Sequence, residues 1–277
     1  MRNTIGSGLL LAIVLGGCPP PKDDTKRLTW AEAQEAVKEA ALASQAENLT
    51  SVTVEISTSF TIGQAVENAA AEVRAFIESQ LPCAEVGLDG ATLTVQYGAK
   101  AGSCTYRGHT FSGTHSITIA SAGGGQLEVQ HTWTGLSNGR VTLDGTAAVT
   151  WDLQAKTRRV VHTADWKRVA DGYAVTGSGD RTQSLLEGGL AEGIQVDGAR
   201  SWETPKGNWD LAIDGVQMRW VDPVPQAGSY TLATPRGRNL SMSFERLDED
   251  TITVTVSGGS NSFDFNVTKI GAVSSGG

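Results

Sequence analysis

Hydrophobic and polar positions change their spacing partway along this chain of 277 residues. Before Glu85 the apolar residues recur mainly at helical intervals. From Glu85 onward they alternate with polar residues, which is typical of strands that bury one face. The 33 glycines and the low aromatic content of 6% indicate many turns between these strands. The pattern therefore predicts a short helical part followed by a long β part.

Two helices are predicted in the first part. Thr29 and Glu32 form a capping-box pattern, and the Ala/Glu-rich residues after them predict a helix near 30–47. Residues 51–61 then alternate, which predicts a strand. From 64 to 81 apolar residues return to helical spacing, and the polar face is rich in glutamate rather than lysine or arginine. That composition favours packing against the core over a membrane surface.

The first long hairpin is predicted to turn at Gly123. Its alternating residues place Gly113 opposite Trp133 and His115 opposite His131, all on the side that faces the core. A large ring over a residue without a side chain shields the strand glycine. A shift of one residue would move the whole apolar set to the polar face, so the alternation specifies which face is buried.

The next hairpin is predicted to turn through 154–157 and to place Gly145 opposite Trp166. The glycine-opposite-tryptophan pairing thus recurs. A third hairpin is expected to set Trp202 against Trp209. In each of these hairpins one face is apolar and the other carries hydroxyl, amide and carboxylate groups, which is typical of a sheet that is solvated on one side.

The tail from 230 to 267 predicts a meander of three to four strands. The segment 221–225 marks either a sub-boundary or a corner within one sheet. We expect a mainly β (α+β) fold: a long, curved, partly barrel-like antiparallel meander with two N-terminal helices, of which helix 64–81 packs on the concave face. Residues 29–277 are interpreted as a single globular domain.

The start of the chain has the form of an export signal. Arg2 precedes an apolar run at 5–15, which is too short to span a membrane as a helix. The next residues, Leu15-Gly16-Gly17-Cys18, resemble the lipobox of bacterial lipoproteins. The resemblance implies that the signal peptide 1–17 is removed and that Cys18 is acylated on its thiol and its new amine. An ordinary cleavage site would need an Ala-x-Ala-like pattern, which these residues lack.

Residues 18–28 are interpreted as a lipidated cysteine with a flexible tether, because three prolines and several charged residues follow Cys18. In the lipoproteins that this lipobox resembles, an aspartate directly after the cysteine favours retention in the inner membrane, so the resemblance implies the outer membrane of the cell envelope for a chain with Pro19 at that position. The whole chain is loosely similar to uncharacterised lipoproteins of myxobacteria. Its layout also resembles envelope lipoproteins that carry other lipoproteins in a half-open β-barrel, a likeness of fold that implies no function.

Cys83 and Cys104 remain once Cys18 is assigned to lipid, out of three cysteines in total. An even pair in an exported protein favours a disulfide. Closing this loop would stabilise the fold by about 3 kcal/mol. The alternative is that the two cysteines bind a metal ion, but two thiolates supply only half of the ligands of a zinc site, and no histidine lies at ligand spacing.

The net charge of −8 argues against general affinity for nucleic acid. No catalytic or cofactor-binding motif is found, so no cofactor is expected. His115 and His131 could share one metal ion, although two ligands do not make a site. The favoured interpretation is a neutral histidine pair that shares a hydrogen bond near the rim of the sheet.

Three tryptophans, Trp133, Trp151 and Trp166, are candidates for lining a ligand groove, but core packing is the favoured interpretation. The leading hypothesis is a non-enzymatic envelope lipoprotein, a structural or binding module whose partners are the membrane, through its lipid, and an unidentified envelope protein or lipid. The alternative is a carrier of lipids, acyl chains or lipoproteins with an apolar cavity of at least about 300 Å³.

Overall fold

The computed structural model describes residues 27–58, 66–123, 126–152, 154–189, 192–219 and 224–276. Two helices, α1 (Trp30–Ile56) and α2 (Val66–Gln80), precede the strands. The strands are β1 (Glu85–Asp89), β2 (Thr92–Tyr97), β3 (Thr105–Tyr106), β4 (His109–Thr110), β5 (Ser112–Gly123), β6 (Gln126–Ser137), β7 (Val141–Asp152), β8 (Thr157–Arg168), β9 (Ala174–Leu185), β10 (Ile194–Thr204), β11 (Gly207–Met218), β12 (Ala227–Ala233), β13 (Asn239–Arg246), β14 (Thr251–Gly258), β15 (Asn261–Thr268) and β16 (Val273–Ser275).

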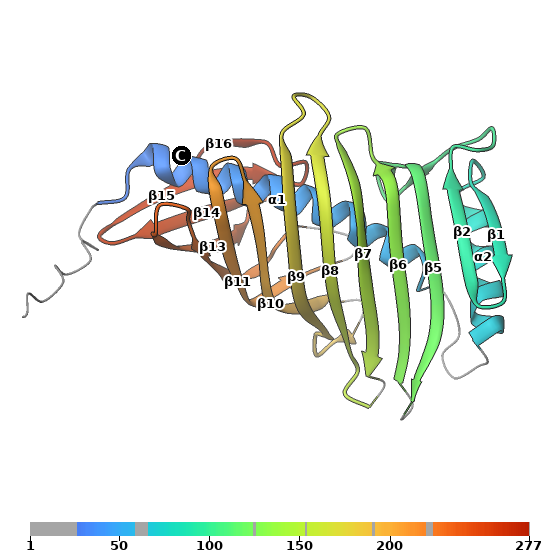
Figure 1. The fold of residues 1–277 in the computed structure, drawn as a ribbon. Coiled ribbons are helices and arrows are strands. Elements are labelled where there is room, and N and C mark those ends of the chain that lie inside the picture. The colour runs from blue at the N-terminus through green and yellow to red at the C-terminus, as the bar shows by residue number, and fades with distance from the viewer. Residues whose placement is uncertain are drawn as a thin grey trace, which may run out of the picture.

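Fourteen strands of the described residues form one antiparallel sheet in chain order, with β1 and β16 at its two edges, and β3 and β4 form a separate small ribbon. The sheet is long and curved and does not close (Figure 1). The mainly β meander predicted from the sequence is therefore confirmed. Because β11 pairs with β12, the same sheet continues across the proposed corner at 221–225, of which 221–223 lie outside the described residues.

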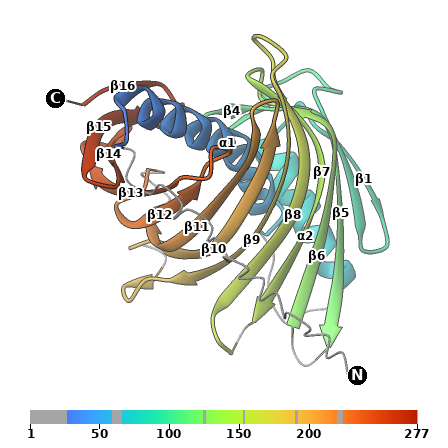
Figure 2. The same ribbon diagram turned by 60° about the vertical axis from the view of Figure 1, so that its left-hand side comes forward.

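Both helices lie on the concave side of the sheet. Figure 2 shows the strands curving around α1, which crosses the sheet from the β14–β16 end towards β7, and α2 covers the β1–β5 end. We call the space on the concave side of the sheet the trough. The sequence predicted only α2 for this position, but the longer α1 fills most of the trough.

Helix α1 begins as predicted but continues past the predicted end. Thr29 accepts a hydrogen bond from the Glu32 N–H, and the Glu32 carboxylate accepts one from the Thr29 N–H, so the capping box is confirmed. The strand predicted for 51–61 is wrong over the described part of that range, because residues 51–56 are helical. The remaining part, 59–61, lies outside the described residues.

The β-branched residues of this segment are held in helical form by packing and by their own hydroxyls. Thr50, Thr53 and Ser57 each donate a side-chain hydrogen bond to a carbonyl three residues earlier. Val54 and Ile56 are buried under the sheet. Burial of each such side chain contributes about 1.5–3 kcal/mol, which exceeds the small helix-propensity cost of β-branching.

The predicted helix 64–81 corresponds to α2, which buries Ala69, Ala70, Val73 and Ile77. Just after it, Cys83 and Cys104 form a disulfide with a Cα–Cα distance of 5.2 Å. The loop it closes has a sequence separation of 21 residues and ends close to the start of β5. The predicted disulfide is therefore confirmed.

The predicted register of the first hairpin is wrong by two residues. Trp133 lies opposite His115 rather than Gly113, and His131 lies opposite Ile117 rather than His115. The ladder reaches its turn later than expected, because Gly123 is itself paired and a bulge precedes it. Turn position and bulges set a hairpin's register, and the alternating pattern does not reveal them.

The second hairpin is displaced in the same way. Gly145 lies opposite Ala164, and Trp166 lies opposite Leu143. The Asp152 carboxylate accepts hydrogen bonds from the backbone N–H groups of Gln154 and Ala155, and so it begins the turn earlier than predicted. A displacement of two residues leaves every side chain on its predicted face, so the buried face is as expected although the pairs are not.

Glycine does lie opposite tryptophan, but across other strand pairs. Trp133 faces Gly145 between β6 and β7, and Trp202 faces Gly177 between β9 and β10. A Cβ on Gly145 would meet the Thr163 carbonyl and the Ala164 Cα, so this position has no room for a side chain. The close neighbours of Gly145 therefore come from β8, whereas Trp133 is its register partner on β6.

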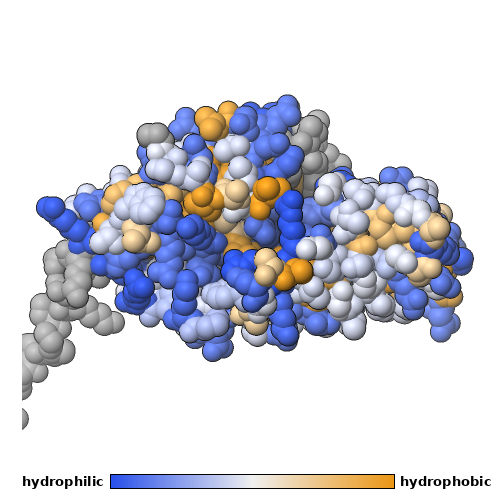
Figure 3. All heavy atoms as spheres, turned by 90° about the horizontal axis from the view of Figure 1, so that it is seen from above, coloured by the Kyte–Doolittle hydropathy of each residue, from blue (hydrophilic) through white to orange (hydrophobic). Residues whose placement is uncertain are grey.

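The remaining predicted strands are confirmed. Trp202 lies opposite Trp209, and the two rings stack with centroids 6.1 Å apart. The tail forms β12 to β15 as a meander, to which a short β16 adds an edge that the sequence did not predict. Seen from above, hydrophobic side chains appear only as small groups among hydrophilic ones (Figure 3).

Candidate functional site

The side of α1 that faces the sheet carries glutamates paired with basic residues from several strands and turns. We call Glu32, Glu35, Glu39, Glu47 and Glu55 the acidic stripe. Glu32 pairs with Arg236 and Arg238 of the β12–β13 turn. Glu35 and Glu39 both pair with Lys206 of the β10–β11 turn, and Glu35 also pairs with Arg236. Glu47 pairs with Arg200 of β10 and Arg181 of β9, and Glu55 pairs with Arg107 of the β3–β4 turn.

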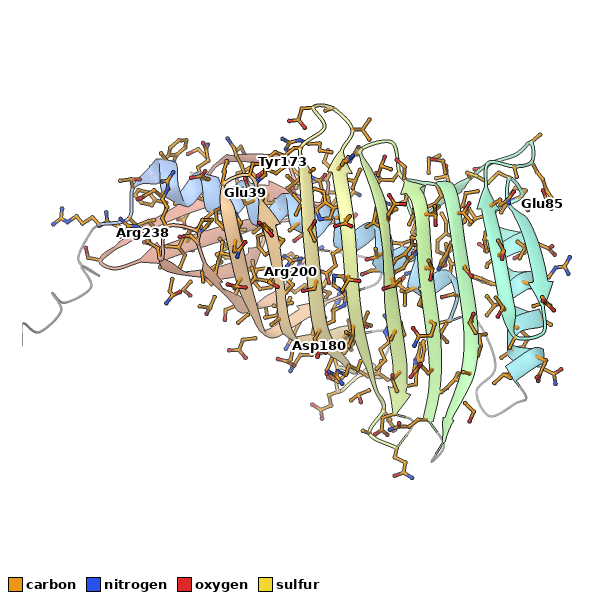
Figure 4. The ribbon with its side chains drawn as sticks, viewed as in Figure 1. Glu39, Glu85, Tyr173, Asp180, Arg200 and Arg238 are labelled. Atoms are coloured by element: carbon orange, nitrogen blue, oxygen red, sulfur yellow. A yellow bond between two sulfur atoms is a disulfide. The ribbon has the colours of Figure 1, made fainter. Side chains whose placement is uncertain are left out.

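The part of the acidic stripe near the N-terminus of α1 is partly exposed. Lys206 Nζ lies 3.0 Å from both Glu35 and Glu39, and the Tyr173 hydroxyl donates to Glu39 at 3.2 Å. Figure 4 shows Glu39 and Tyr173 near each other at the upper ends of the strands. Exposed ion pairs contribute about 0–1 kcal/mol each, so this end of the stripe orients α1 more than it stabilises it.

The middle of the stripe is buried. Glu47 forms ion pairs with both Arg181 and Arg200, whose side chains are only 7% exposed. Arg200 also donates to Ser44 at 2.8 Å, and Arg181 donates to Ser51 at 2.9 Å. Burial, together with the neighbouring charge of Arg200, lowers the pKa of Arg181 to about 10. One carboxylate thus serves two buried guanidinium groups.

Aromatic rings and a histidine surround this pair of arginines. The Arg200 guanidinium lies 5.8 Å from the Trp202 ring centroid and 5.6 Å from that of Tyr230. His162 lies in register with Gly179, which in turn pairs with Arg200, so these three residues share one row across β8, β9 and β10. Burial, together with the charge of Arg200, lowers the pKa of His162 to about 4.

A small cavity of about 30 Å³ lies between α1 and this row. Its lining includes Glu47 and Thr50 from α1 and His162, Arg200 and Trp202 from the sheet. The space can hold one water-sized group but no acyl chain. The carrier hypothesis stays a prediction, and it would require α1 to leave the trough.

His115 and His131 lie together although they are not a register pair. Their Nε2 and Nδ1 atoms are 3.0 Å apart, and Tyr97 Oη lies 3.2 Å from the Nδ1 of His115. Both histidines are fully buried rather than near a rim. Burial lowers the pKa of His131 to about 3 and that of His115 well below its ordinary value. Both rings are therefore neutral at pH 7.

The neutral rings form one directed hydrogen-bond chain. If Tyr97 donates to Nδ1 of His115, then Nε2 of His115 donates to Nδ1 of His131, so His115 uses one donor and one acceptor and His131 uses only its acceptor. The remaining Nε2 of His131 then has no hydrogen-bond partner among the described residues. Within the same residues no group of three or more His, Cys, Asp or Glu side chains is placed to hold a metal ion. The described residues therefore supply no third ligand for a metal ion at His115 and His131.

The predicted tryptophans have different surroundings. Trp133 and Trp166 are buried, at 1% and 5% exposure, and Trp151 is partly buried against the core. The Trp133 ring stacks on His115 and His131. Trp166 lines the small cavity.

The solvated face of the sheet carries a groove of about 420 Å³ over β7 to β11. Its polar side chains belong to the outward-facing positions of these strands, and the inward-facing residues Ala164 and Trp202 also line it. Thr176 donates to Asp165 at 2.6 Å, which orders one carboxylate in the groove. The lining carboxylates are Asp144, Asp165, Glu203 and Asp210, and the lining hydroxyls are those of Thr163, Thr176, Ser178 and Ser201.

The sequence did not predict these groups as sites. Arg181 and Arg200 occupy inward positions of alternating strands, where a charged residue is a recognisable exception. That exception was the available signal for the buried cluster. The groove acids carry no comparable signal, because acidic residues are ordinary on a solvated face.

Comparison with protein-family models, curated proteins and solved structures finds no match to this chain. Neither helix of the described residues is long and apolar enough to cross a membrane. Cys18 and the tether lie outside the described residues. The candidate sites are therefore defined by their geometry: the buried cluster under α1 and the groove on the opposite face.

Proposed function

We propose that the mature protein is a non-enzymatic binding module held at the cell envelope by lipid on Cys18. The lipobox-like leader and the tether after it support the anchor. With α1 in the trough, the apolar face of the sheet is covered, and the solvated face remains for a ligand. The outer-face groove is the observation that carries this proposal.

The chemistry of the groove favours a ligand rich in hydroxyl and amino groups. Carboxylates accept hydrogen bonds from hydroxyls and pair with ammonium groups, and Ser and Thr hydroxyls both donate and accept. These groups stand on a rigid sheet, which holds them in fixed positions. An amino-sugar polymer has this combination of groups, so we take it as the ligand class.

Calorimetric titration with glucosamine oligomers tests the groove. Removal of two lining carboxylates (Asp165→Asn with Glu203→Gln) should weaken binding by about tenfold or more. The matched control (Asp180→Asn with Glu128→Gln) removes the same charge from the same face outside the groove and should bind as the wild type does. Equal affinity of the two double variants, or no binding by the wild type, would overturn the ligand assignment.

The anchor is tested separately by membrane flotation. The wild-type protein should float with membranes, and the Cys18→Ala form should stay in the soluble fraction. A Cys18→Ala form that still floats would contradict the lipid anchor but would leave the groove assignment intact.

A further inference from the structure

We infer that the buried cluster under α1 is a binding site for a single chloride ion, held between the helix and the sheet by N–H groups of His162, Arg200 and Trp202. This inference does not depend on the outer-face groove. It rests on three observations: the charge balance, the unpartnered donors and the size of the cavity.

The buried cluster carries a net positive charge. Arg181 and Arg200 are both buried, and Glu47 is the one carboxylate paired with either of them within the described residues. Two guanidinium charges thus face one carboxylate charge. A buried charge without a counter-ion costs several kcal/mol, so an anion beside these arginines would stabilise the fold.

Three buried nitrogens of residues that line the cavity have no hydrogen-bond partner in the described part of the chain. They are Nδ1 of His162, Nε of Arg200 and Nε1 of Trp202. Arginine and tryptophan nitrogens of this kind only donate, and neutral histidine donates from one ring nitrogen. Buried donors are satisfied in nearly all native proteins, so a set of three around one cavity indicates an acceptor there.

The register explains how these donors meet. His162, Gly179 and Arg200 form one row across three strands, and Gly179 puts no side chain between the other two. Nδ1 and Nε2 of His162 lie 3.1 and 3.2 Å from the position that a Cβ on Gly179 would occupy, so the imidazole ring lies over this glycine. Trp202 follows Arg200 by two residues on the same face of β10.

The size of the cavity selects the anion. A volume of about 30 Å³ accepts one water molecule or one monatomic ion, but not an anion of the size of phosphate or sulfate. Net positive charge and convergent donors favour the anion over water, because water would leave the excess charge uncompensated. Chloride is the monatomic anion that is abundant outside cells.

Thermal unfolding at constant ionic strength tests this site, with chloride exchanged for the bulky anion gluconate. The wild-type midpoint should rise with chloride and reach saturation. Trp202→Phe keeps the ring but removes one donor, so it should weaken the apparent chloride affinity by about tenfold or more. Trp209→Phe is the matched control, because Trp209 stacks on Trp202 but its Nε1 already donates to Thr204 at 3.4 Å.

Crystals soaked in sodium bromide give a second measurement that needs no variant. The inference predicts an anomalous peak within hydrogen-bond distance of the three donors. A midpoint that does not respond to chloride, equal chloride affinity of the two tryptophan variants, or a water molecule without an anomalous peak in the cavity would each overturn it.

Discussion

The indole Nε1 of Trp133 donates a hydrogen bond of 3.0 Å to the hydroxyl of Thr53. Both groups are buried, and the bond joins β6 to the last turns of α1. It links the two places where the chain departs from its local pattern: the β-branched end of α1 and the register of the first hairpin. The inner face of the sheet and the helix therefore depend on each other.

Thr53→Val should destabilise the fold by about 1–3 kcal/mol, because it leaves the Trp133 N–H buried without an acceptor. Thr50→Val is the matched control: among the described residues the Thr50 hydroxyl bonds to Glu47 within its own helix, and its loss should cost about 0.5 kcal/mol or less. Urea unfolding measures both. Equal losses of unfolding free energy in the two variants would show that the bond to Trp133 contributes nothing.

Gly145→Ala should cost about 1–3 kcal/mol, because the new Cβ would collide with the backbone of Thr163 and Ala164. Gly87→Ala in β1 is the control, since its Cβ would lie 3.8 Å from the Thr94 carbonyl oxygen, an ordinary contact. That variant should be neutral or slightly stabilising. A Gly145→Ala protein as stable as Gly87→Ala would contradict the close approach of β7 and β8.

Stability should fall as the pH drops below about 6.5. Burial holds the pKa of His115, His131 and His162 below the ordinary value, so the unfolded chain takes up protons that the folded chain does not. The contribution of the histidines is complete above pH 6.5 and is lost as the pH falls towards 4. Three such groups give a slope of up to about 4 kcal/mol per pH unit, which urea unfolding at pH 7, 6 and 5 would measure. Unchanged stability over this range would show that these rings are not buried.

Protonation of Glu55 should partly offset this loss of stability at low pH. Burial is the main cause that raises the pKa of Glu55 to about 7, while Arg107 and Arg158 act against it. The folded chain then holds one proton more than the unfolded chain between pH 4.5 and 7, which favours folding as the pH falls. Glu55→Gln should therefore steepen the acid-side loss by about 1.4 kcal/mol per pH unit. An unchanged slope would place Glu55 in contact with solvent.

The buried face could be predicted from the sequence because it depends on local alternation, as the inward positions of Trp133 and Trp166 show. The register could not, because the bulge before Gly123 and the turn begun by Asp152 are set by geometry that alternation does not record. The end of α1 was mispredicted because its β-branched residues favour a strand locally, and packing decides otherwise.

The candidate sites were harder to predict for a different reason. Glu47 and Arg200 are separated by 153 positions in the sequence, and only the folded meander brings them together. The neighbours His115 and His131 could be anticipated because they belong to one hairpin. Contacts between a helix and distant strands have no comparable local pattern.

The position of α1 in the trough is tested most directly by hydrogen exchange with mass spectrometry on residues 27–277. If α1 is a fixed part of the core, the amides of 46–56 should exchange as slowly as those of β7 and β8. In the Glu47→Lys variant, which places like charges beside Arg181 and Arg200, exchange in α1 should become faster before exchange in the strands does. Amides of 46–56 that exchange in the wild type as fast as an unfolded peptide would show that the trough is open, and would contradict this structure.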